Sequence, residues 1–208
     1  MRRTKEDAEK TRRAILDASV KLFAEKGVAE TSLEEIGRLA NVTRGAIYWH
    51  FKNKIEIFDE LHKQLYQPLS GMILNDMEVD HPDPLQQIKE LSIALLIDVA
   101  RNEPKRQAIM LFLMKANYTG ELEKYRVLHR ERKHDNVDLF SRYFEKARSK
   151  GILPPDASPD TLALAVRCFM KGIVFEYLND PEIFDMELQA PRLMETFFGG
   201  LVVVRSTK

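Results

Sequence analysis

Residues 31–54 read TSLEEIGRLANVTRGAIYWHFKNK, and this stretch decides the fold. Its first residues offer two overlapping capping boxes, Thr31 with Glu34 or Ser32 with Glu35. In a capping box a hydroxyl and a carboxylate three positions apart satisfy the free amides at the start of a helix. A short helix is therefore expected to begin at this point.

The next signals are a turn and a second cap. Asn41 is a residue type that tolerates the left-handed backbone of a tight turn, and Thr43 can cap another helix over residues 44–50. Two short helices joined by a tight turn form a helix-turn-helix, whose second helix enters the major groove of DNA. We predict this motif at about residues 32–51.

A helix over residues 5–26 precedes the motif, and Gly27 is the expected left-handed stop. The remaining chain shows helical periodicity and no sustained alternation typical of strands. We predict an all-α protein of about nine helices, with a DNA-binding domain at 1–54 and a larger helical domain at 55–208. Pro68, inside the long helix expected from Lys54 to about Met77, should kink that helix or mark a hinge. The later helices are expected at 85–101, 105–118, 121–150, 159–178 and 186–204.

Charge and composition agree with a cytoplasmic DNA-binding protein. The formal net charge is zero, but residues 1–54 hold twelve Lys or Arg against eight Asp or Glu. A local basic surface of this kind is typical of a DNA-binding head. The single cysteine, Cys168, cannot form an intrachain disulfide. The N-terminus is charged, and no apolar run approaches the ~20 residues of a membrane span, so neither a secretory signal nor a membrane partner is expected.

Residues 43–54, TRGAIYWHFKNK, closely resemble the recognition-helix signature of the TetR/AcrR repressors. Residues 11–18, Leu22-Phe23 and Gly27 resemble helix 1 of the same family. Within the family the chain looks most like the branch that represses multidrug efflux pumps. The resemblance implies an all-α homodimer that binds a palindromic operator. It also implies that 55–208 is a ligand-binding and dimerisation domain, and that a small molecule bound there releases the protein from DNA.

The residue chemistry of the second helix fits DNA. Gly45 allows close approach of the backbone, and Thr43 with the first helical amides can hold a phosphate. Arg44 could reach guanine O6 and N7 bidentately, or grip a phosphate; Trp49 could equally be a core aromatic. The predicted DNA-binding residues are Ser32, Thr43, Arg44, Gly45, Tyr48, Trp49, His50 and Lys54.

The resemblance places a ligand pocket among the helices of the body, where Met and aromatic side chains make an adaptable apolar lining. A Met/Phe stripe can also be plain core. Tyr66 and Asn117 stand where the efflux branch often has acids, so neutral, amphipathic or anionic ligands are as plausible as cationic drugs. The predicted ligand-binding residues are Leu65, Tyr66, Leu69, Met72, Leu96, Ile109, Met110, Leu113, Met114, Asn117, Phe169, Ile173 and Tyr177.

Dimerisation is expected through the last two helices. One face of the final helix carries Leu193, Phe197, Leu201 and Val204 with Gly199-Gly200, and the helix before it carries Leu162, Val166, Phe169 and Ile173. These residues of the earlier helix cannot face both a pocket and a partner, and the sequence leaves their division open.

No enzyme, cofactor or metal site is expected. His129 and His134 lie five positions apart rather than the four of a helical metal pair. The chain has no glycine-rich phosphate loop and no nucleophile elbow. The remaining alternatives are a helical small-molecule carrier without DNA binding and a DNA-binding regulator without a small-molecule inducer.

Overall fold

The computed structural model describes residues 5–78, 81–115 and 120–202. Within these ranges nothing is described of the side chains at 66–70, 72, 114–115, 121, 124, 128–137 and 202. The described ranges hold nine α-helices, one π-helix and one 3-10 helix, which confirms the predicted all-α fold. No helix among the described residues has the length and apolarity to cross a bilayer.

The chain forms two compact units. One consists of Met1–Gln67 with Glu103–Leu128, and the other of Pro68–Asn102 with His129–Lys208. The first unit includes more of the chain than the segment predicted to bind DNA, because later residues pack against the first helix. The predicted domain boundary after Lys54 stays a prediction.

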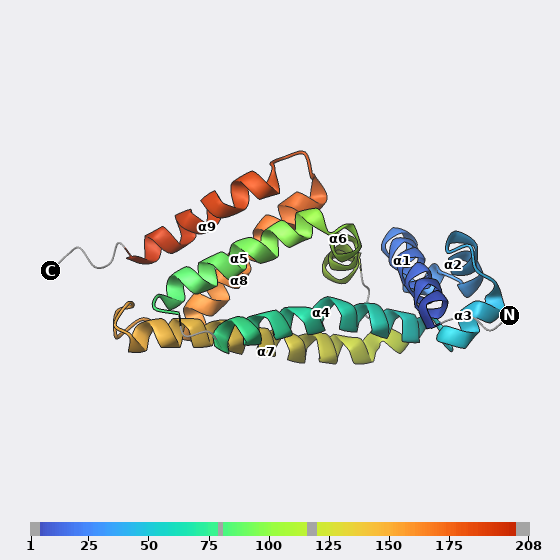
Figure 1. Ribbon diagram of the computed structural model, residues 1–208, viewed down its shortest axis with the longest axis horizontal. Coiled ribbons are helices and arrows are strands. Elements are labelled where there is room, and N and C mark those ends of the chain that lie inside the picture. Colours follow the sequence, from blue (N-terminus) through green and yellow to red (C-terminus); the bar gives the residue numbers. More distant parts are fainter. Residues whose placement is uncertain (1–4, 79–80, 116–119, 203–208) are drawn as a thin grey trace. The chain divides into compact units, whose positions relative to one another are not determined.

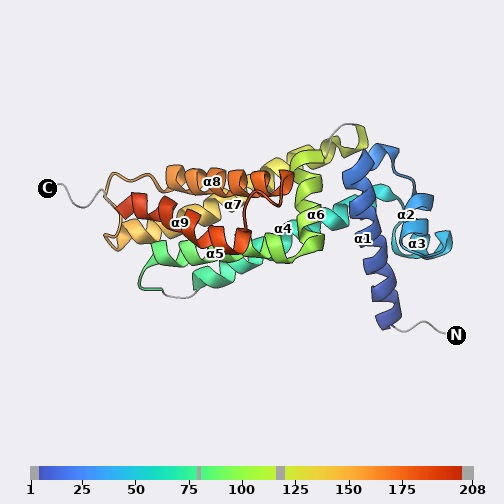
Figure 2. The ribbon, with the colours of Figure 1, turned by 90° about the horizontal axis from the view of Figure 1, so that it is seen from above.

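In the first unit three helices form the N-terminal bundle, and Figure 2 shows the second and third packed together beside the first. The π-helix and the helix before it pack on α1. Phe23, Ile36, Ile47 and Phe58 are fully buried in the shared core. The helices of this unit are α1 (Lys5–Glu30), α2 (Leu33–Leu39), α3 (Arg44–His50), the first part of α4 (Lys54–Glu78), α6 (Glu103–Met110), the π-helix η1 (Leu111–Lys115), the 3-10 helix η2 (Gly120–Leu122) and the start of α7 (Glu123–Ser149).

Gly27 breaks α1 as predicted, with φ 87° and ψ 161° inside the span assigned to that helix. This backbone conformation is essentially restricted to glycine. The residues after it, up to Glu30, return to helical geometry. The first helix therefore ends in a separate short turn that leads into α2.

In the second unit α5 (Pro84–Arg101) packs along α9 (Met186–Val202), as Figure 1 shows. α8 (Pro159–Asn179) also contacts α5. Asp83 caps α5, accepting from the amides of Leu85 and Gln86, and Ser158 caps α8.

Three side-chain donors of the second unit bind carbonyls in the last part of α4. The buried Tyr143 hydroxyl donates to Ile73 O (3.2 Å) and to Asp76 Oδ2 (2.6 Å), and burial is the main cause that raises the pKa of Tyr143. Lys146 Nζ donates to Met77 O at 2.7 Å, and Gln87 donates to Asp76 O at 2.5 Å. These contacts fix the end of α4 to α7 and α5.

Two predicted helices differ in detail, whereas the long helix predicted from Lys54 is observed as one helix. The helix expected over 105–118 begins at Glu103 and widens into a π-helix after Met110, whereas residues 116–119 lie outside the described ones. The helix expected from Glu121 begins with a 3-10 turn and becomes α-helical at Glu123. α4 continues through Pro68 as one helix. The apolar run at 109–114 has no helical periodicity, so the change of helix type left no mark in the sequence pattern.

Candidate functional site

α2 begins with a complete capping box, formed by the second of the two predicted pairs. The Glu35 amide donates to Ser32 Oγ at 3.2 Å, and the Ser32 amide donates to Glu35 Oε2 at 2.9 Å. Lys26 of α1 also bonds the Glu35 carboxylate. The bond from Lys26, followed by those from Ser32, lowers the pKa of Glu35 to about 2. Thr31 instead donates to Gly27 O at 2.7 Å.

The turn between α2 and α3 has the geometry that the sequence predicts. Asn41 has φ 53°, and its amide donates to Arg38 O while the Val42 amide donates to Gly37 O. This pair of bonds is the Schellman ending of a helix. A Cβ on Gly37 would lie 3.1 Å from Ile47 Cδ1, so this glycine lets the two helices approach closely.

α3 presents a polar and aromatic face to solvent. Thr43 caps it by accepting from the Ala46 amide at 3.2 Å. Arg44 is exposed, and its guanidinium lies 5.5 Å from the centre of the Tyr48 ring and donates to the Tyr48 hydroxyl at 3.3 Å. That hydrogen bond raises the pKa of Arg44. Trp49 is 72% exposed, so it is no core aromatic of the described structure.

Three of the remaining predicted DNA-binding residues also have defined places. Gly45 is exposed, and a Cβ added to it would have Thr43 Oγ1 as its nearest neighbour, 4.0 Å away. His50 stacks edge-on against Trp49. Lys54 Nζ donates to Ala29 O at 2.6 Å and to Thr31 O at 3.2 Å. The Lys54 ammonium thus joins the start of α4 to the α1–α2 connection.

Sequence reasoning missed Arg12, which contacts the end of α3 and the α4 helix. The sequence pattern could have indicated this residue, because Arg12 lies at helical spacing from the buried residues Leu16, Ser19 and Phe23. A cation on the apolar face of an amphipathic helix requires a specific partner.

The predicted ligand-binding residues fall in both units, and several lie outside the described ones. Asn117 and the side chains of Tyr66, Leu69, Met72 and Met114 belong to this group. In the first unit, the described members are half-buried. Leu65 packs against the core, and Ile109, Met110 and Leu113 flank the fully buried Leu111.

In the second unit, α8 and α9 line an apolar hollow of about 490 Å³. Two predicted ligand-binding residues, Phe169 and Ile173, lie in its wall with Leu193. Tyr177 instead packs against Phe184, and Leu96 is fully buried in the core. The structure therefore brings Phe169 and Ile173 together and places Leu96 in the interior.

The outer face of α8 differs from the partner face suggested by the sequence. Val166 and Ile173 are buried in the core of their own unit, and Phe169 stacks on Phe197 of α9. Leu164 and Phe175 are large apolar residues of α8 that are exposed, at positions that share a helical face.

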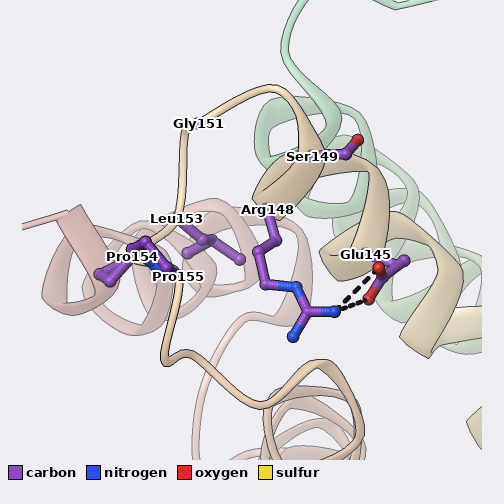
Figure 3. Close-up of a pocket in the computed structure, with 7 residues that line it drawn as sticks. All are labelled: Glu145, Arg148, Ser149, Gly151, Leu153, Pro154 and Pro155. Atoms are coloured by element: carbon purple, nitrogen blue, oxygen red, sulfur yellow. Dashed lines mark hydrogen bonds and ion pairs between the residues drawn. The ribbon is translucent and has the colours of Figure 1, made fainter.

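A second hollow, of about 590 Å³, lies at the α7–α8 connection (Figure 3). Arg148 in its wall is bound to both carboxylate oxygens of Glu145, at 2.9 and 2.8 Å. None of the predicted ligand-binding residues lines this hollow. Among the described residues, no group of three or more His, Cys, Asp or Glu could hold a metal ion.

Two family descriptions match the chain. "Bacterial regulatory proteins, tetR family" matches residues 15–61, and "MAATS-type transcriptional repressor, C-terminal region" matches residues 83–202. The first covers α2, the turn and α3, and the second covers most of the chain that follows.

Individual relatives agree with these matches. The transcriptional repressor BepR of Brucella suis is 32% identical, over 97% of this chain and 96% of the relative. NalD, the secondary repressor of the MexAB-OprM multidrug efflux pump in Pseudomonas aeruginosa, has a crystal structure with TM-score 0.78 and 33% identity, over 98% of this chain and 100% of that one. The SmeT–triclosan complex has TM-score 0.78 and 26% identity, over 91% and 90%. This chain belongs to the TetR family of bacterial transcriptional regulators.

Proposed function

We propose that this chain is a homodimeric repressor that binds a palindromic operator before an efflux or transport operon. A small hydrophobic or amphipathic ligand releases it. The observation that carries DNA binding is the solvent-facing side of α3, where Arg44, Tyr48 and Trp49 project beside a capped, positively polarised helix N-terminus. Relatives such as NalD, which represses an efflux pump, support the choice of operon.

The exposed residues on α3 have different roles in DNA recognition. Arg44 is the base reader, because a guanidinium can bond guanine O6 and N7 together. Thr43, Gly45 and the first amides of α3 hold a phosphate, which sets the register of the helix in the groove. In a two-fold dimer, two such helices would enter successive major grooves about 34–36 Å apart.

Operator binding is tested by titrating the protein with DNA from upstream of its own gene. Trp49 is the only tryptophan, so its fluorescence reports on the recognition helix directly. We expect the affinity to fall steeply with salt, with a log–log slope of about −0.9 for each phosphate contact. Arg44→Ala should lower operator affinity by about tenfold and reduce the preference for operator over unrelated DNA by a similar factor.

Arg142→Ala is the matched control, because Arg142 is exposed on α7 and its replacement makes the same change in charge. It should leave the sequence preference intact. A salt-independent affinity, or an unchanged preference in Arg44→Ala, would contradict the proposed function.

Ligand release is tested with triclosan, the compound in the SmeT complex. Triclosan is an apolar phenol, which suits the apolar hollow lined by Phe169, Ile173 and Leu193. We expect it to lower operator affinity by about 5- to 150-fold, the usual range of allosteric coupling. If triclosan does not lower operator affinity, calorimetric titration of the DNA-free protein shows whether triclosan fails to bind or binds without causing release. The second result favours a regulator without an inducer of this class.

A further inference from the structure

Arg12 of α1 joins three elements of the first unit. Its guanidinium nitrogen lies 3.0 Å from Glu60 Oε2 on α4, and the guanidinium carbon lies 5.2 Å from the centre of the Phe51 ring. Phe51 is buried and is the C-cap of α3, where its amide donates to Ile47 O at 2.8 Å. Arg12 thus contacts the point at which the recognition helix ends and also the helix that follows it.

This ion pair is less exposed than most of the others on the surface. The side chains of Arg12 and Glu60 are 27% and 25% exposed, so both charges have given up much of their hydration. A partly desolvated pair is screened less by salt than an exposed one. The planar guanidinium can also stack on an aromatic ring while it bonds a carboxylate, which an ammonium group does less well.

We propose that Arg12 is a positioning residue for operator recognition, acting through Phe51 and Glu60 and not through contact with DNA. This inference rests on the proposed function. α3 has seven residues, too few to be stable alone, so its orientation depends on what it packs against. Thr43 fixes its N-terminus, and Arg12 fixes its C-terminus against α1 and α4.

The competing explanation is that Arg12 belongs to the basic surface and grips a phosphate. The two explanations give opposite results for Glu60. If only charge matters, Glu60→Gln removes a repulsive acid and strengthens DNA binding. If Glu60 holds Arg12 in place, the same substitution weakens binding.

The experiment compares Arg12→Gln, Arg12→Lys, Glu60→Gln and the Arg12→Gln/Glu60→Gln double variant. Arg13→Gln and Glu25→Gln are the matched controls, since both residues are exposed on α1. Arg13→Gln makes the same change in charge as Arg12→Gln, and Glu25→Gln makes the same change in charge as Glu60→Gln. We expect Arg12→Gln to weaken operator binding about tenfold, and Glu60→Gln to weaken it by a similar factor. The double variant should lose no more than Arg12→Gln alone, because both substitutions break one interaction.

Two further readouts separate positioning from a phosphate contact and from a loss of folding. The salt slope of operator binding should stay at the wild-type value in Arg12→Gln, whereas loss of a phosphate contact reduces it by about 0.9. Arg12→Lys keeps the charge but loses the planar stack, so it should weaken binding while circular dichroism shows an unchanged helix content.

Hydrogen exchange gives a readout that needs no DNA. The Phe51 amide should exchange about tenfold faster in Arg12→Gln and Glu60→Gln than in Arg13→Gln, because the end of α3 is released. If the wild type binds no operator, the proposed function fails while this exchange result still decides the role of Arg12. The inference is overturned if Phe51 exchange is unchanged, or if Glu60→Gln strengthens operator binding.

Discussion

Glu35 shows how one side chain connects two helices. Its carboxylate completes the cap of α2 and also binds Lys26 of α1. The same group therefore stabilises the start of α2 and its attachment to α1. Ser32 takes part in this cap through both its amide and its hydroxyl, which ties a predicted DNA-binding residue to the local structure.

Glu35→Gln should lower the stability of the protein at neutral pH, and the loss should depend on pH. The folded-state pKa of about 2 lies below the ordinary value of 4.5. The carboxylate therefore contributes stability that is present above about pH 4.5 and is lost as the pH falls towards 2. Urea unfolding of wild type and variant should show a difference that is largest near pH 7 and shrinks across this window.

Glu34→Gln is the control for this experiment, because Glu34 is the exposed neighbour in the same helical turn. It should change stability little and without the same dependence on pH. A stability difference between Glu35→Gln and wild type that stays constant from pH 7 to pH 2 would contradict the assigned role.

At the scale of elements, the short helices depend on backbone conformations that few residues can adopt. Gly27→Ala should lower the free energy of unfolding by about 1–3 kcal/mol, because φ 87° with ψ 161° is strained for any residue with a Cβ. Urea denaturation measures the loss. Gly71→Ala is the opposite case, since Gly71 is helical and an added Cβ meets no atom within 4 Å.

Gly71→Ala should raise stability by up to about 1 kcal/mol through helix propensity. Equal effects of the two alanine substitutions would show that backbone conformation at Gly27 does not limit stability.

The elements that could be predicted from the sequence are those fixed by local chemistry. The turn at Asn41 and the caps at Thr43, Asp83 and Ser158 each depend on residues within a few positions of one another, so their pattern is readable. Two features could not be predicted in this way. The π-helix at Leu111–Lys115 lies in an unbroken apolar run, and the Arg12–Glu60 pair joins residues far apart in the chain.

The candidate sites show the same distinction between features fixed by local sequence and features fixed by packing. The exposed face of α3 follows from a short motif, whereas the residues that line a pocket depend on how several helices pack. Val166 and Ile173 show the difference, because helical spacing allows them to face a partner but packing places them in the core.

At the scale of the whole molecule, DNA binding to a palindrome requires two copies of the chain. We propose that the exposed face of α8 is part of the dimer contact. Phe175→Glu would place a charge in that contact, and an unpaired buried charge is strongly unfavourable. Sedimentation at micromolar concentration should then show a 24.1 kDa monomer with much weaker operator binding.

Val127→Glu is the matched control, because Val127 is an exposed apolar residue on α7 in the first unit. It should remain dimeric. A dimeric Phe175→Glu variant would exclude this face of α8 from the contact.

The proline inside α4 has a mechanical consequence for the release that we propose. The helix runs without interruption from Lys54 to Glu78, yet the two compact units divide between Gln67 and Pro68. Pro68 has no amide hydrogen, so it cannot donate the usual helical bond to the carbonyl of Gln64. The missing bond lowers the bending stiffness of α4 locally, at the position in the sequence where the division between the two units falls. In the release that we propose, bending of α4 at Pro68 would therefore store little elastic energy, and most of a ligand's binding energy would remain available to shift the equilibrium away from DNA.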